Sequence, residues 1–139
     1  MLATARFYRR AVFQSTSNRS KRWTPIHNQS HGESFLSIVQ NRFFGNGLYI
    51  LDEPEAALSP MRLLTLMAEI NKLVKKNSQF IIATHSPILM AFPGAEILEF
   101  TKDGIKRVDY RETEHFKITK GFLENPEIML DFLMGNDDI

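Results

Sequence analysis

Residues 48–55 of the sequence read Leu48-Tyr49-Ile50-Leu51-Asp52-Glu53-Pro54-Glu55 and carry the strongest indication of the fold. Its four apolar residues follow a glycine and precede acids, which predicts a short strand buried on both faces of a parallel sheet. This strand brings two adjacent carboxylates, those of Asp52 and Glu53, to its carboxyl end. Because open α/β sheets bind their ligands at that edge, the two acids are candidates for a functional site.

Two acids in succession can divide the work of phosphoryl transfer. The reaction needs an oxygen ligand for magnesium and a second group that holds the attacking water. We expect Asp52 to serve the metal and Glu53 to serve the water. Without further motifs, the same residues are equally well explained by a strand that ends in a solvated acidic turn.

A histidine at the end of the next predicted strand strengthens the functional interpretation. Residues 79–83, Gln79 followed by four apolar residues, are predicted as this strand, and Thr84-His85-Ser86 follows it. An imidazole there can contact a terminal phosphate or the attacking water. Alone, His85 would more often be structural or exposed. Its pairing with Asp52 and Glu53 in consecutive strands favours a shared site at one sheet edge.

A third segment, Ser30-His31-Gly32-Glu33-Ser34, places a hydroxyl and a glycine N–H at the start of a predicted helix. Helix N-termini bind anions through free N–H groups and the helix dipole, so Ser30 and Gly32 are candidate phosphate ligands. Ordinary helix capping by Ser30 explains these residues as well, and for this segment taken alone it is the better explanation.

The remaining pattern is that of an α/β protein. Ser59-Pro60 is typical of a helix start, and Lys102-Asp103-Gly104 predicts the turn of a hairpin. The full set of expected elements is helix 32–44, strand 48–51, helix 60–76, strand 79–83, a short helix from Ser86-Pro87, a hairpin of 95–100 with 105–110, and helices 113–123 and 126–134.

Charge and composition divide the chain near residue 30. Six of the 17 basic residues precede the first acid, Glu33, so we expect residues 1–29 to form a basic, poorly ordered leader and residues 30–139 to fold. A basic, acid-free start also resembles a mitochondrial transit peptide or an arm that binds nucleic acid. The sequence has no Cys and no apolar run long enough to span a membrane, so we expect a cytoplasmic protein without thiol chemistry.

Together, four motifs resemble those of ABC-type ATPases, the superfamily of transporter motors and SMC-like DNA-repair ATPases. The signature motif corresponds to SHGES (30–34), Walker B to LYILDEPE (48–55), the D-loop to ALSP (57–60) and the switch histidine to IIATHSP (81–87). More narrowly, the chain is similar to bacterial AAA/ABC-like ATPases without a membrane permease. Residues 113–127 resemble the carboxyl end of that group.

The resemblance implies a partial P-loop NTPase fold, in which helices flank a parallel sheet core and an edge hairpin and carboxyl-terminal helices follow. It implies ATP and Mg as cofactors, with Asp52 coordinating magnesium, Glu53 polarising the lytic water and His85 contacting the terminal phosphate. Ser30 and Gly32 would reach ATP held by a partner subunit, and the D-loop would lie at the same dimer interface.

Two departures from the family pattern bear on function. A Walker A phosphate-binding loop requires Gly-Lys followed by Ser or Thr, yet no glycine in the sequence is followed by lysine. In addition, His31 and Glu33 stand where the signature motif usually has glycine and glutamine.

Three functions therefore stay open. The favoured one is the catalytic half of an ATPase whose phosphate-binding loop lies on another segment or another chain. The second is a non-catalytic module that associates with an intact relative. The third is a DNA-associated, SMC-like partner that binds nucleic acid through its basic arm.

Overall fold

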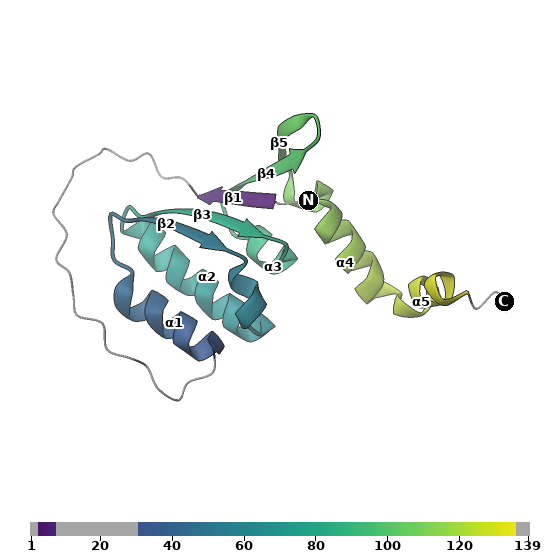
Figure 1. The fold of residues 1–139 in the computed structure, drawn as a ribbon, viewed down its shortest axis with the longest axis horizontal. Helices are drawn as coiled ribbons and strands as arrows, with labels where there is room; N and C mark the ends of the chain where they lie inside the picture. Colours follow the sequence, from purple (N-terminus) through teal and green to yellow (C-terminus); the bar gives the residue numbers. More distant parts are fainter. Residues whose placement is uncertain (1–2, 8–30, 136–139) are drawn as a thin grey trace.

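A five-stranded mixed sheet with helices on one face organises the computed structural model, which describes residues 3–7 and 31–135 (Figure 1). The strands lie in the order β2-β3-β1-β4-β5. Their bounds are β1 Ala3–Phe7, β2 Leu48–Asp52, β3 Gln79–Thr84, β4 Ala95–Thr101 and β5 Gly104–Val108. The helices are α1 His31–Arg42, α2 Pro60–Lys75, α3 Pro87–Met90, α4 Glu114–Glu124 and α5 Pro126–Met134, with 3-10 turns η1 Pro54–Ala57 and η2 Tyr110–Glu112.

The predicted parallel pair is confirmed. Strands β2 and β3 run parallel in a register that matches Leu48 with Gln79 and Asp52 with Ala83. Helix α2 connects them, as a crossover between parallel neighbours requires. Both carboxyl ends therefore lie at the same edge of the sheet. The mixed α/β architecture agrees with the predicted partial P-loop NTPase fold.

The core lies between α2 and the two parallel strands. The predicted apolar face of α2 is buried through Leu63, Leu66, Ile70 and Leu73. On β3 every second residue faces this helix, and Phe80 and Ile82 are almost completely buried. Because each buried aliphatic or aromatic side chain contributes about 1.5–3 kcal/mol, this helix–sheet contact supplies much of the stability of the described part.

An aromatic stack fixes the connection between α1 and β2. The rings of Phe43 and Tyr49 are parallel, with centroids 4.1 Å apart, and Tyr49 also contacts Phe80. The Tyr49 hydroxyl donates to the Phe44 carbonyl oxygen at 2.8 Å and accepts from the Phe44 N–H at 2.6 Å. A Cβ added at Gly47 would lie 2.7 Å from the Tyr49 ring, so only glycine fits there.

The prediction that β2 is buried on both faces was wrong. Leu48 and Ile50 are 60% and 73% exposed, whereas Tyr49 and Leu51 pack against the core. The physical reason is position: β2 is an edge strand with one neighbour, and no helix among residues 31–135 covers the second face of the sheet. Four apolar residues in a row do not reveal how many neighbours a strand has.

Strand β1 was not predicted. It pairs antiparallel with both β3 and β4, so Ala5 lies between Ile82 and Ile97 in the middle of the sheet. It comes from the stretch 1–29 that we expected to be a leader. Of the basic residues proposed as a nucleic-acid arm, Arg6 lies in β1, and the other five lie outside the described residues, as does Ser30.

The carboxyl-terminal third follows the prediction closely. Strands β4 and β5 form the expected antiparallel hairpin at the sheet edge. Helices α4 and α5 follow it and extend away from the sheet, as Figure 1 shows. Among the described helices, none combines the length and apolar character that a membrane crossing demands.

Candidate functional site

A backbone hydrogen bond joins the turn after β2 to the end of β3. The Glu53 N–H donates to the Ala83 carbonyl oxygen at 2.9 Å. To make this turn, Glu53 adopts a left-handed backbone conformation with φ 42° and ψ 52°. A non-glycine residue pays about 1 kcal/mol or more for that conformation, and such strain is characteristic of functional sites.

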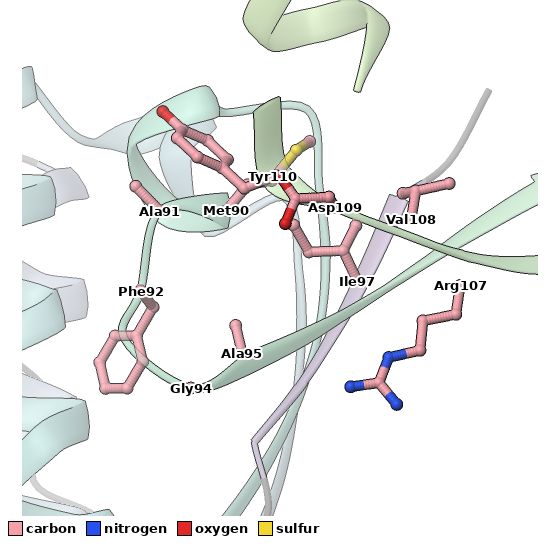
Figure 2. A pocket seen from close by; sticks show the side chains of 10 residues that line it. All are labelled: Met90, Ala91, Phe92, Gly94, Ala95, Ile97, Arg107, Val108, Asp109 and Tyr110. Atoms are coloured by element: carbon pink, nitrogen blue, oxygen red, sulfur yellow. The ribbon is translucent and has the colours of Figure 1, made fainter. Parts of the chain in front are cut away.

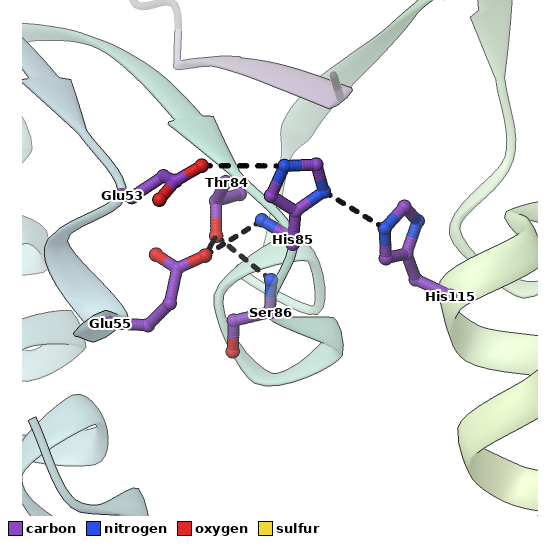
Figure 3. Close-up of polar contacts among 6 residues, drawn as sticks. All are labelled: Glu53, Glu55, Thr84, His85, Ser86 and His115. Carbon is purple, nitrogen blue, oxygen red and sulfur yellow. Dashed lines mark hydrogen bonds and ion pairs between the residues drawn. The ribbon is translucent and has the colours of Figure 1, made fainter. Parts of the chain in front are cut away.

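Glu55 clamps the two turns together (Figure 3). Its Oε1 accepts one hydrogen bond from the Thr84 hydroxyl and another from the His85 N–H, both at 2.7 Å. The Thr84 oxygen in turn accepts from the Ser86 N–H at 3.0 Å. Thr84 is fully buried, so these bonds form away from bulk water. We did not predict this role for Glu55; its only signal was its place in the acidic run after β2.

Glu53 and His85 face each other across the sheet edge. Glu53 Oε1 lies 3.4 Å from His85 Nε2, and both side chains are partly exposed. This contact places a carboxylate and an imidazole at the carboxyl ends of adjacent parallel strands. The pair can therefore act on one bound molecule while remaining open to it.

A second histidine, His115, completes a chain of three side chains. His85 Nδ1 lies 3.0 Å from His115 Nε2, so His85 stands between Glu53 and His115 (Figure 3). His115 belongs to the first turn of α4, thirty residues after His85. The sequence placed it inside a family-like tail segment but gave it no role, because no local pattern indicates which strand end α4 reaches.

A pocket of about 420 Å³ lies elsewhere, between α3 and the β4–β5 hairpin (Figure 2). Its two charged residues already have partners. Arg107 lies 3.6 Å from Glu96, and the Asp109 side chain accepts from the Arg111 N–H at 3.0 Å. None of the candidate site residues lines this pocket.

Comparison with known families identifies the family of the chain. The family model described as "AAA domain, putative AbiEii toxin, Type IV TA system" matches residues 9–91, which is more than half of the chain. The chain belongs to this AAA-domain family. The match includes Asp52, Glu53 and His85, and it begins ahead of the boundary that we expected near residue 30. No curated protein and no solved structure matched the chain.

The other predicted residues of this AAA domain occupy less central positions. Asp52 is the last residue of β2, and its side chain is exposed. Gly32 lies in the first turn of α1, which begins on the side of the sheet toward which β2 and β3 run (Figure 1). Within the D-loop stretch, Leu58 is buried in the core, so part of that motif is structural here.

The donor set of the AAA domain fits magnesium that arrives with a nucleotide. Residues 31–135 and β1 contain no group of three His, Asp or Glu side chains placed to hold a metal by themselves. Nucleotide-bound Mg²⁺ needs only one or two carboxylates, since phosphate oxygens and waters supply its other ligands. The exposed carboxylate of Asp52 meets that requirement.

Proposed function

We propose that this AAA domain supplies the water-activating and phosphate-contacting residues of an ATP-hydrolysing site. The phosphate-binding loop would come from a second polypeptide or from another part of a longer chain. The main support is the 3.4 Å approach of Glu53 to His85 at the ends of parallel neighbouring strands. Membership in the AAA-domain family supports a nucleotide-binding, ATPase-like function in general.

The roles within this proposal follow from the chemistry of each group. Glu53 accepts a hydrogen bond from the attacking water and polarises it. His85 donates a hydrogen bond to an oxygen of the terminal phosphate. Asp52 would hold Mg²⁺, which when bound neutralises charge on the phosphates. Glu55 contributes indirectly, because its two 2.7 Å hydrogen bonds hold Thr84 and His85 against the turn that contains Glu53.

The finer, ABC-type arrangement also belongs to the proposal. Ser30 and Gly32 would contact ATP held by a partner subunit, and residues 57–60 would lie at the same interface. The position of Gly32 supports this idea, since the first turn of α1 lies on the side of the sheet toward which β2 and β3 run. A helix start there offers free N–H groups to a phosphate.

The test is ATP turnover by the chain mixed with the loop-containing half of an intact family member. We expect no turnover by the chain alone and measurable turnover by the mixture. Glu53→Gln should lower the rate of the mixture by about 10²–10⁴-fold, because the amide no longer draws a proton from water. The matched control is Glu124→Gln, which alters an exposed acid near the end of α4.

Two outcomes of this assay would count against the proposal. A mixture that hydrolyses ATP at the same rate with Gln at position 53 would show that Glu53 does not activate the water. A well-formed mixture that binds ATP and never hydrolyses it would favour the second candidate function below.

The second candidate function is that of a module that docks on an intact relative without catalysing hydrolysis. Its support is the uncovered sheet face and the edge strand β2, where Leu48 and Ile50 are exposed. Edge strands and large apolar surfaces favour association over a free monomer. Helix α5, which lies away from the sheet, is a second exposed apolar element, since its Phe132 is 86% exposed.

A further inference from the structure

We propose that His115 is a positioning residue that fixes the ring of His85 and makes Nε2 the hydrogen-bond donor of His85. The catalytic part of this inference rests on the proposed function, because His85 would donate its hydrogen bond to the terminal phosphate. The hydrogen bond between the two rings is a property of the chain itself. It can therefore be tested without ATP hydrolysis.

The direction of the hydrogen bond between His115 and His85 follows from the donor and acceptor capacity of each group. An ionised carboxylate only accepts, so the His85 Nε2 that lies 3.4 Å from Glu53 Oε1 must carry the proton. A neutral imidazole has one donor and one acceptor, so His85 Nδ1 is then the acceptor. For two neutral rings, His115 Nε2, 3.0 Å away, is then the donor. The N–H group of His115 thus points to His85, and the N–H group of His85 points to Glu53.

The opposite direction would be unfavourable. If His85 Nδ1 donated to His115, the lone pair of His85 Nε2 would face the carboxylate of Glu53, which also only accepts. Such a ring could not donate to a phosphate oxygen either. Only the first arrangement satisfies both contacts of His85 when both rings are neutral.

The fold holds His115 firmly enough for this role. Thr113, at the start of α4, is 2% exposed, and its hydroxyl donates to the Tyr110 carbonyl oxygen at 2.8 Å and accepts from the Phe116 N–H. The rings of Tyr110 and Phe116 pack with centroids 4.7 Å apart. The first turn of α4 is therefore anchored on both sides of His115.

Two substitutions of similar length separate the alternatives. His115→Gln keeps an N–H donor at the end of the side chain and should preserve the ring state of His85. His115→Glu offers only acceptors, so it should pull the proton to His85 Nδ1 and either expose a lone pair at Nε2 or leave the ring charged. A merely structural role for His115 would make the two variants alike. Lys120→Gln is the control, since it changes an exposed side chain later on α4 that pairs with Glu124.

The experiment is nitrogen NMR of the histidine rings in the chain labelled with ¹⁵N. In the unaltered chain we expect a scalar coupling between the two ring nitrogens across the hydrogen bond, with the proton on His115 Nε2 and on His85 Nε2. His115→Gln and Lys120→Gln should keep His85 in that state, and His115→Glu should change it. Backbone spectra confirm that each variant is folded. Absence of the coupling, or a His85 ring that ignores both substitutions at 115, would overturn the inference.

ATP turnover by the chain mixed with a loop-containing half then tests whether His115 supports catalysis through His85. His115→Gln should retain most of kcat, and His115→Glu should lower kcat by at least about 10-fold, as expected for a residue that orients a functional imidazole. If the coupling is present and no mixture hydrolyses ATP, the proposed function fails and the ring hydrogen bond stands. If turnover is normal with Glu at 115, the positioning role is wrong.

Discussion

At the level of single residues, the acids that follow β2 have different tasks. Glu53 is partly exposed and contacts His85, whereas Glu55 accepts two hydrogen bonds from the turn after β3. Within the described part of the chain, the other oxygen of Glu55, Oε2, is buried and has no hydrogen-bond partner. Glu53 is therefore accessible to a bound molecule, whereas Glu55 holds the turn after β3 in place.

Replacing Glu55 should show this structural role. Glu55→Ala leaves the Thr84 hydroxyl and the His85 N–H without their acceptor, so we expect the free energy of unfolding to fall by about 1–3 kcal/mol. Glu55→Gln keeps a carbonyl oxygen for the same bonds and should cost less. Urea denaturation measures both values. Glu124→Ala, which removes an exposed ion pair with Lys120, should change stability by less than about 0.5 kcal/mol. If Glu55→Ala and Glu55→Gln lowered the free energy of unfolding equally, Glu55 would not act through these hydrogen bonds.

The sequence could anticipate one contact of the site but not the others. Glu53 and His85 follow two runs that read as parallel neighbours, and the carboxyl ends of such strands share one edge. The clamp by Glu55 depends on which N–H groups remain free after β3, which no local pattern encodes. The approach of His115 depends on how a hairpin and a 3-10 turn return the chain to that edge.

At the level of elements, the helices and the hairpin were predictable because their signals are local. Apolar spacing in α2 and the Lys102-Asp103-Gly104 turn are read within a few residues. The position of β2 at the edge and the insertion of β1 between β3 and β4 are decided by distant neighbours. A strand with mixed composition such as Ala3–Phe7 carries no pattern that identifies its place in a sheet.

Two glycines test how tightly the elements are packed. Gly47→Ala should lower the free energy of unfolding by about 1–3 kcal/mol, because the new Cβ would press on a Tyr49 ring held by Phe43 and Phe44. Gly121→Ala in α4 meets nothing closer than 4.0 Å and should raise stability by about 0.5–1 kcal/mol, since alanine favours helices. Thermal unfolding compares them. If Gly47→Ala raised the stability, the stack of Phe43 and Tyr49 would have room for the added Cβ.

At the level of the whole molecule, one face of the sheet is covered and the other is not, within the described residues. Sheets normally bury an apolar face against a second layer. Here Leu48 and Ile50 remain exposed on the face opposite α1 and α2. Under the proposed function, we expect a loop-containing partner to contact the domain through that face.

Sedimentation of the chain with the loop-containing half checks this expectation. Ile50→Lys should weaken association by about 10-fold or more, because a charge would be buried at the contact. Leu64→Lys places the same charge on the exposed side of α2 and should leave association unchanged. If both variants associate as the unaltered chain does, the uncovered sheet face is not the contact.

The location of bound nucleotide tests the central claim most directly. Mn²⁺ bound to ATP broadens the NMR signals of nearby residues, and it can be added to the ¹⁵N-labelled chain assembled with its loop-containing half. We predict that the amide signals of Glu53 and His85 lose intensity, while that of Asn77, at the opposite end of β3, is retained. Unchanged signals at Glu53 and His85 in an assembly that hydrolyses ATP would contradict the assignment of the site.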